Sequence, residues 1–243
     1  MVTVETCTLL WTYLHVSLAP GKYQELHYKF IHRALPTKAR IVKWQCKGRL
    51  NPNCSICLRS NKSHLEHHVH LFFDCPHAFA VWRMVKLVLG ELLPKHRPQC
   101  YMFTFALFPS DMTPQSRKLT MTLVQLTLFE IWINRNKYNY EHIIIDPMTS
   151  FDKIKKDFSM ILRNLFKKMK RGHNLVNFRK FYCDNDLLSV NGSDELCVSY
   201  PWFLMFTFIC CWNWLFSVLL FIKGLIPESL ELLILYCNLR IFT

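Results

Sequence analysis

The stretch Cys54-Ser55-Ile56-Cys57, followed by His70-Leu71-Phe72-Phe73-Asp74-Cys75, decides how this chain folds. A Cys-x-x-Cys pair places two thiolates on one tight turn, and the His-x4-Cys pair brings two further ligands from a short element. Three cysteines and one histidine are a standard closed ligand set for structural zinc. Because a closed set leaves no position for water or substrate, we predict an ion that stabilises the fold rather than one that catalyses a reaction.

The spacing leaves the choice of histidine open. Twelve residues separate Cys57 from His70, and they include His64, His67 and His68, each of which is able to replace His70 as a ligand. The alternative to a metal site is a pair of reduced surface thiols beside a polar loop. Four potential ligands at workable spacing seldom coincide by accident, which favours zinc.

Composition and charge narrow the class of partner. With 243 residues, 51% of them hydrophobic, the chain is long enough to bury a core and is not disordered throughout. Its 30 Lys and Arg against 17 Asp and Glu give a net charge of +13, which favours nucleic acid first and anionic lipid second. The 11 cysteines are an odd number without the dense spacing of a disulfide scaffold, so we expect an intracellular protein of the nucleus or cytoplasm.

The periodicity of apolar residues predicts a mostly α-helical chain. Helices are expected from Tyr23 to Leu35, after Thr37, from His77 to Leu93, from Pro114 toward Tyr140, and from a Ser150 cap to Gly172. The predicted organisation is an N-terminal segment 1–22, a zinc-stabilised helical lobe 23–93, a linker 94–112, a basic region of long amphipathic helices 113–198 and a hydrophobic tail 199–243 that includes a helix.

One of these helices carries the second candidate site. From Ser150 to Gly172 one face is apolar, and the rest of the surface is rich in cations. Such a row can follow a phosphate backbone without reading sequence, whereas the alternative is an ordinary solvated face. The cations are Lys153, Lys155, Lys156, Arg163, Lys167, Lys168, Lys170 and Arg171.

The hydrophobic tail allows a different class of function. Tyr200 to Ile222 contains no charged side chain, and a helix of that length can cross a bilayer. A transmembrane helix over residues 201–222 would make the chain a single-pass membrane protein. Basic residues before the span outnumber those after it, which would place the N-terminal domain in the cytoplasm.

The order of several motifs resembles the zinc-binding domain of reverse transcriptases in non-LTR, LINE-like retrotransposons. The motifs are Phe30-Ile31-His32-Arg33-Ala34-Leu35-Pro36-Thr37, Arg40, Trp44, the two ligand pairs, Pro76, Val81-Trp82 and Ile131-Trp132-Ile133-Asn134-Arg135-Asn136-Lys137, which together cover roughly Tyr23 to Tyr140. The resemblance implies zinc held by Cys54, Cys57, His70 and Cys75, and an accessory nucleic-acid-binding role beside a polymerase. Two departures are a long gap between Cys57 and His70 and the absence of the family's usual Glu-Ser/Thr pair before the histidine.

Polymerase, endonuclease and RNase H motifs are not found in the sequence. The string nearest to a polymerase Tyr/Phe-x-Asp-Asp motif is Tyr182-Cys183-Asp184-Asn185, which lacks the second aspartate. We therefore expect a non-catalytic zinc-binding module derived from a retrotransposon reverse transcriptase, which binds RNA or DNA through phosphate contacts and takes no small-molecule substrate. The alternatives are the membrane protein described above and a decayed mobile-element product without activity.

Overall fold

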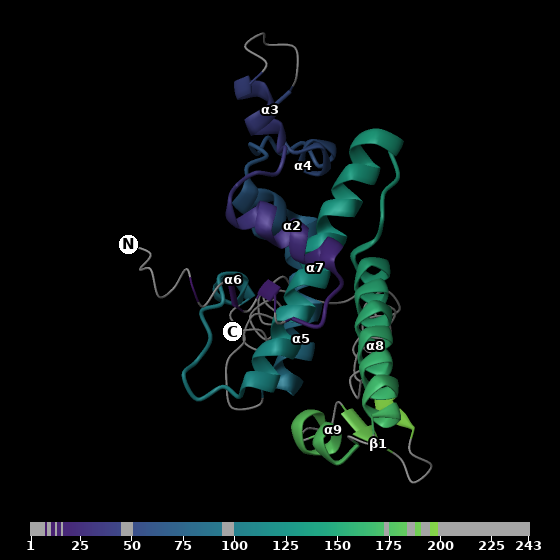
Figure 1. Cartoon of the computed structure of the whole chain (residues 1–243). Coiled ribbons are helices and arrows are strands. Elements are labelled where there is room, and N and C mark those ends of the chain that lie inside the picture. The colour runs from purple at the N-terminus through teal and green to yellow at the C-terminus, as the bar shows by residue number, and fades with distance from the viewer. Residues whose placement is uncertain are drawn as a thin grey trace, which may run out of the picture. The chain divides into compact units, whose positions relative to one another are not determined.

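The computed structural model describes residues 8, 11–12, 14–15, 17–44, 51–93, 100–172, 175–183, 188–190 and 195–198 (Figure 1). The chain divides into two compact units, Met1–Ser199 and Tyr200–Thr243, and all described residues belong to the first. The predicted helix in the hydrophobic tail and its candidate span 201–222 lie outside the described residues. Among the helices that the structure does describe, none is both long and apolar enough to cross a membrane.

The described part is mostly helical, as the sequence predicted. Two short antiparallel strands, which the sequence analysis did not anticipate, pair with Leu188 opposite Val198. The elements are α2 (Gly21–Ile31), α3 (Lys38–Trp44), α4 (Ser55–Arg59), the π-helix η1 (His70–Asp74), α5 (Pro76–Leu92), α6 (Cys100–Thr104), α7 (Pro114–Glu141), α8 (Pro147–Arg171), α9 (Leu175–Tyr182), β1 (Leu188–Val190) and β2 (Leu196–Val198).

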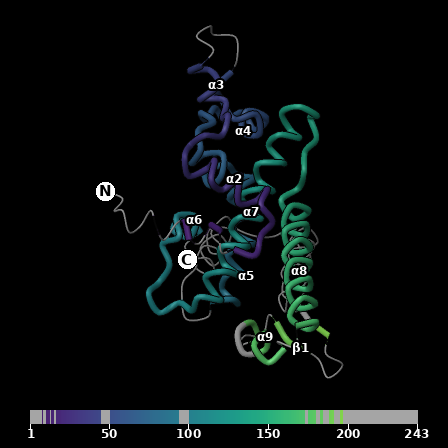
Figure 2. Tube along the Cα trace, viewed as in Figure 1, coloured from purple at the N-terminus to yellow at the C-terminus, as the bar shows by residue number. Residues whose placement is uncertain are grey.

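Helix α7 is the element against which most others pack. It contacts α2, α5, α6, α8 and η1, and the trace in Figure 2 shows it turning back into α8 as a helical hairpin. Its start is as predicted, with Pro114 in the first turn and the Thr113 hydroxyl accepting the Ser116 N–H at 3.1 Å. Because neighbours cover several sides of α7, even Thr120, Gln125 and Thr127 are buried.

The predicted cap of α8 is wrong by one turn. The helix begins at Pro147, and the Asp146 carboxylate accepts the N–H groups of Met148 and Thr149 at 2.8 and 3.4 Å. Aspartate caps a helix as well as serine does, and proline suits the first helical position, so the Asp-Pro pair sets the start. Ser150 lies inside the first turn, buried, and its hydroxyl accepts a hydrogen bond from Asn134 on α7 at 2.7 Å.

Helices α2 and α5 complete the support of the site. The apolar face of α2 is as predicted at Tyr23, Leu26 and Phe30, but the helix ends at Ile31 and its buried face also includes His27. On α5, the Trp82 indole N–H donates to the Phe72 carbonyl at 2.7 Å, which ties this helix to η1. The core therefore continues directly into the segment that carries two of the predicted ligands.

Candidate metal centre

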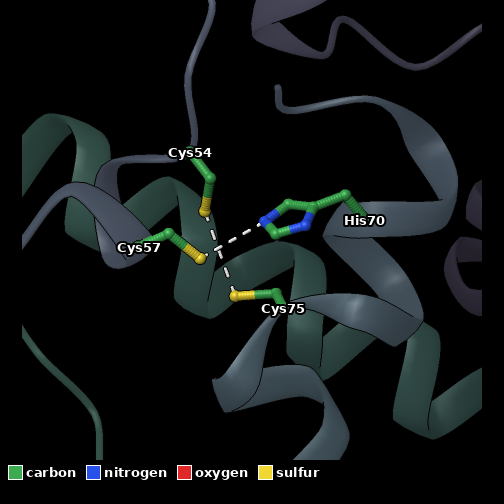
Figure 3. A group of neighbouring side chains, drawn as sticks. All are labelled: Cys54, Cys57, His70 and Cys75. Atoms are coloured by element: carbon green, nitrogen blue, oxygen red, sulfur yellow. Dashed lines mark hydrogen bonds between the residues drawn. The ribbon is translucent and has the colours of Figure 1, made fainter. Parts of the chain in front are cut away.

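The four predicted ligands converge on one point. One donor atom from each of Cys54, Cys57, His70 and Cys75 lies within 4.8 Å of the other three, and all four residues are buried (Figure 3). The Sγ atoms of Cys54 and Cys75 are 3.9 Å apart, and Nε2 of His70 lies 3.4 Å from the Cys57 Sγ. We call these four residues the zinc cluster.

A π-helical turn brings His70 and Cys75 together. Five residues along an α-helix are about 1.4 turns, which would direct the two side chains to roughly opposite sides. Here the segment His70–Asp74 forms the π-helix η1, which is closed by the Cys75 N–H donating to the His70 carbonyl at 2.7 Å. The wider turn places residues i and i+5 above one another, so both ligands face the same point. Cys75 then starts α5, with Pro76 in its first turn.

The other two ligands come from a tight loop before and within α4. Cys54 precedes the helix and Cys57 lies in it. The loop is closed on both sides: the Cys54 N–H donates to the His64 carbonyl at 2.8 Å, and the Lys62 N–H donates to the Cys57 carbonyl at 3.0 Å. Asn61 has φ 54°, a left-handed conformation that asparagine tolerates better than most residues. The region 51–75 is called the zinc loop below.

The structure also separates His70 from the other histidines. The backbone N–H of His70 donates to Nδ1 of His67 at 3.1 Å, so His67 supports the ligand instead of replacing it. The ring of His64 stacks beside His70 with centroids 5.3 Å apart. Among the described residues, the group of side chains placed to hold a metal ion does not contain His64, His67 or His68.

The electrostatics of the cluster require a cation if all three cysteines are to be thiolates. The pKa of Cys54 falls to about 4, because Cys75 donates a hydrogen bond to its sulfur and the Cys57 N–H also points to it. The hydrogen bond to Cys54 and burial raise the pKa of Cys75 instead. Burial and the neighbouring Cys54 charge raise the pKa of Cys57 to about 11. The charge of one buried thiolate thus opposes ionisation of the other two thiols. A bound divalent ion reverses this effect and stabilises all three thiolates.

The donor set and spacing fit zinc. Zinc–sulfur bonds of about 2.3 Å in a tetrahedron imply sulfur-to-sulfur distances of about 3.8 Å, close to the 3.9 Å between Cys54 and Cys75. Three sulfurs and one imidazole fill all four tetrahedral positions. The predicted structural zinc is therefore consistent with the geometry, and its role would be to fix the zinc loop.

A buried ion pair that the sequence analysis did not identify holds the zinc loop against α7. The Arg135 guanidinium donates to Oε1 of Glu66 from Nε at 3.1 Å and from Nη2 at 2.5 Å, and both side chains are almost fully buried. The same oxygen accepts the Lys38 backbone N–H at 3.0 Å. Arg135 lies in the segment Ile131–Lys137, which contributed to the family resemblance, but nothing in the sequence linked it to Glu66.

The predicted cations of α8 do not all behave alike. Lys153 pairs with Glu130 at 2.5 Å, and Lys155, which is mostly covered, pairs with Asp152 at 2.7 Å. The other six predicted cations are exposed. Five of them share one helix face at spacings of three, four and seven residues, and we call them the basic ridge: Lys156, Arg163, Lys167, Lys170 and Arg171.

A comparison with protein-family models finds a match at the N-terminal end of the chain. The model described as zinc-binding in reverse transcriptase covers residues 2–82, about a third of the chain, and so includes all four residues of the zinc cluster. It starts before the region in which the sequence showed the resemblance and ends before α7. No curated protein and no solved structure gives a significant match. Residues 2–82 therefore carry the reverse-transcriptase zinc-binding domain found in retrotransposon proteins, as the motifs predicted.

Proposed function

We propose that this zinc-binding module binds nucleic acid through phosphate contacts made by the basic ridge of α8. The single observation that carries the proposal is the arrangement of that helix. Phe151, Ile154 and Phe158 are buried, whereas the ridge lies on the opposite, exposed side. From Phe158 to Arg171 the sequence contains five cations and no carboxylate.

Helix stability does not account for the whole ridge. Cations in the last turn of a helix interact favourably with its dipole, which suffices to explain Lys170 and Arg171. Lys156, Arg163 and Lys167 lie before that turn, where the dipole has little effect. The ridge extends about 22 Å along the helix, enough to meet several successive phosphates.

The module is proposed to have no catalytic activity of its own. A Cys3His set that fills the four positions of zinc leaves no site on the ion for water or substrate. The ion would supply folding energy, while the helices supply the contact surface. Phosphate contacts of this kind discriminate poorly among sequences, so the proposal is for RNA or DNA without a defined sequence.

Neutralising the ridge tests the proposal. The full-length double variant Arg163→Gln/Lys167→Gln is compared with Lys29→Gln/Lys86→Gln, which removes two exposed cations from α2 and α5 and changes net charge equally. Affinity for a duplex oligonucleotide is measured across a series of salt concentrations. Loss of two ridge contacts is expected to lower the slope of log affinity against log salt by about 1.8, at about 0.9 per contact.

The control separates a local site from net charge. If the ridge forms the contact, the control variant keeps the wild-type slope and most of the affinity. Equal losses in both variants would mean that overall charge attracts nucleic acid and that α8 is not the site. Binding by the wild-type chain that does not change with salt would reject phosphate contacts altogether.

A further inference from the structure

Helix α3 presents an aromatic side chain to solvent beside the zinc loop. None of its seven residues, Lys38–Trp44, is buried, and all seven are described. Trp44 at its end is 57% exposed. Tryptophan side chains are normally kept mostly covered, whereas this indole leaves more than half of its surface accessible to solvent.

The second planar group of this surface is the guanidinium of Arg40. Its central carbon lies 4.5 Å from the centre of the Trp44 ring, which is a cation–π contact. Aromatic rings and arginine guanidinium planes are the groups on which proteins stack unpaired bases. Lys43, on the same helix, is exposed.

The charge around these two groups has one sign. Arg33 and Arg40 both lie close enough to His68 to influence it electrostatically. Among the described residues, Arg33, Arg40 and Lys43 have no carboxylate in an ion pair with them. The nearby Glu66 is buried and is bound by Arg135, so it does not neutralise them. We call Arg33, Arg40, Lys43 and Trp44 the α3 surface.

The zinc loop holds this surface in place. The Lys38 and Ala39 backbone N–H groups donate to Glu66, to its carboxylate at 3.0 Å and its carbonyl at 3.3 Å. The Lys38 ammonium also donates to the Ser55 hydroxyl, one residue after Cys54. Because α3 buries no side chain of its own, these contacts with the zinc loop help to fix its position.

From this arrangement we infer that the α3 surface is a binding site for single-stranded nucleic acid, in which an unpaired base stacks on Trp44 and Arg40. The inference rests on the proposed function and adds to it the form of nucleic acid that is preferred. A phosphate-binding ridge meets single and double strands alike, whereas only an unpaired base can reach an indole face. The zinc ion would then matter for binding because it orders the loop that positions α3.

The test separates stacking from phosphate contact. Full-length wild type, Trp44→Ala, Trp44→Phe and the control Phe79→Ala, which removes an equally exposed aromatic from α5, are titrated with oligothymidylate and with a hairpin duplex. Zinc content is measured for each to show that the fold is kept. Trp44→Ala is expected to weaken oligothymidylate binding about tenfold, with duplex binding and the salt slope unchanged. Trp44→Phe keeps most of the affinity, and Phe79→Ala has no effect.

Each other result overturns the stacking site. Equal weakening of both oligonucleotides by Trp44→Ala, or none, means that the indole does not read unpaired bases. If Trp44→Ala instead releases the chain from vesicles of anionic phospholipid and leaves oligothymidylate binding intact, the surface binds lipid. The proposed function fails separately, through the ridge variant Arg163→Gln/Lys167→Gln, whose effect is on the salt slope of duplex binding.

Discussion

The zinc loop and the helical core, which consists of α2, α5, α7 and α8, are stabilised in different ways. In residues 51–69 of the zinc loop, before η1, only Cys54, Cys57 and Glu66 are buried, and the segment is held by the zinc cluster, hydrogen bonds and one ion pair. In the helical core, Val85, Leu123 and Phe158 are completely or almost completely buried. A loop organised by an ion and a core organised by apolar burial should respond differently to the same perturbation.

Removing the metal should give the largest difference between the two regions. Chelation, or Cys75→Ser, is expected to abolish order in residues 51–69 of the zinc loop, since structural zinc contributes about 10–16 kcal/mol in small zinc domains. Hydrogen exchange followed by mass spectrometry should show lost protection in residues 51–69 and retained protection in α7 and α8. Cys100→Ser, a free cysteine outside the zinc cluster, serves as the control and should keep both zinc and protection. Equal loss in both regions would contradict the comparison.

Breaking the ion pair that joins the two regions should come next. Arg135→Met leaves the Glu66 carboxylate buried without its partner and is expected to cost about 3–5 kcal/mol of unfolding free energy. The double variant Glu66→Gln/Arg135→Met removes both charges and should be less damaging than the sum of the single variants. Chemical denaturation of the three variants measures the coupling. Additive losses would show that the pair does not link the zinc loop to α7.

A cavity in the helical core should reduce stability without affecting zinc. Phe158 on α8 is fully buried, so Phe158→Ala is expected to cost about 3–5 kcal/mol. Denaturant unfolding gives the loss, and zinc content of the folded variant should remain that of the wild type. A variant that loses zinc while still folded would mean that the two regions are not separately stabilised.

Acid should weaken the helical core through His27. Its Nε2 donates to the Thr104 carbonyl at 2.7 Å, its Nδ1 is buried without a partner, and burial lowers its pKa to about 4. The unfolded chain takes up this proton near pH 6.5 and the folded chain only near pH 4. Stability should therefore fall as the pH drops through that window, by about 3 kcal/mol in total.

The matched variant for this pH effect is His27→Gln, which keeps a donor for Thr104 and cannot be protonated. Unfolding free energies of wild type and variant are measured between pH 7 and 4 at saturating zinc. Release of zinc in acid affects both proteins alike and cancels in the difference. Parallel curves would exclude His27 as the source of the pH dependence.

The smallest effect is expected at the start of α8. Asp146→Ala removes the acceptor for the Met148 and Thr149 N–H groups and should cost about 1 kcal/mol. Ser150→Ala, at the position that the sequence favoured as the cap, instead removes the buried partner of Asn134. Thermal unfolding of the two variants, read together with zinc content, shows whether the cap acts on the helical core alone.

Local sequence chemistry predicted much of the fold and of the metal centre. The start of α7 at Thr113-Pro114 follows from helix-capping preferences, and the apolar face of α8 follows from the helical period of its apolar residues. Both signals depend only on residues that are close together in the sequence. The zinc ligands followed from their spacing, because both pairs lie within short segments. Asp146 was overlooked since serine and aspartate are nearly equal caps, and sequence alone did not rank them.

What the sequence determined by itself was the set of residue types able to bind zinc and the periodicity of the long helices. Tertiary structure selected His70 from four histidines, because the π-turn that orients it is held to α5 by the hydrogen bond from the Trp82 indole to the Phe72 carbonyl. It also paired Glu66 with Arg135, which lie 69 residues apart. The tertiary structure also leaves Trp44 exposed beside Arg40. Such choices depend on contacts between distant segments, and no local pattern of residues records them.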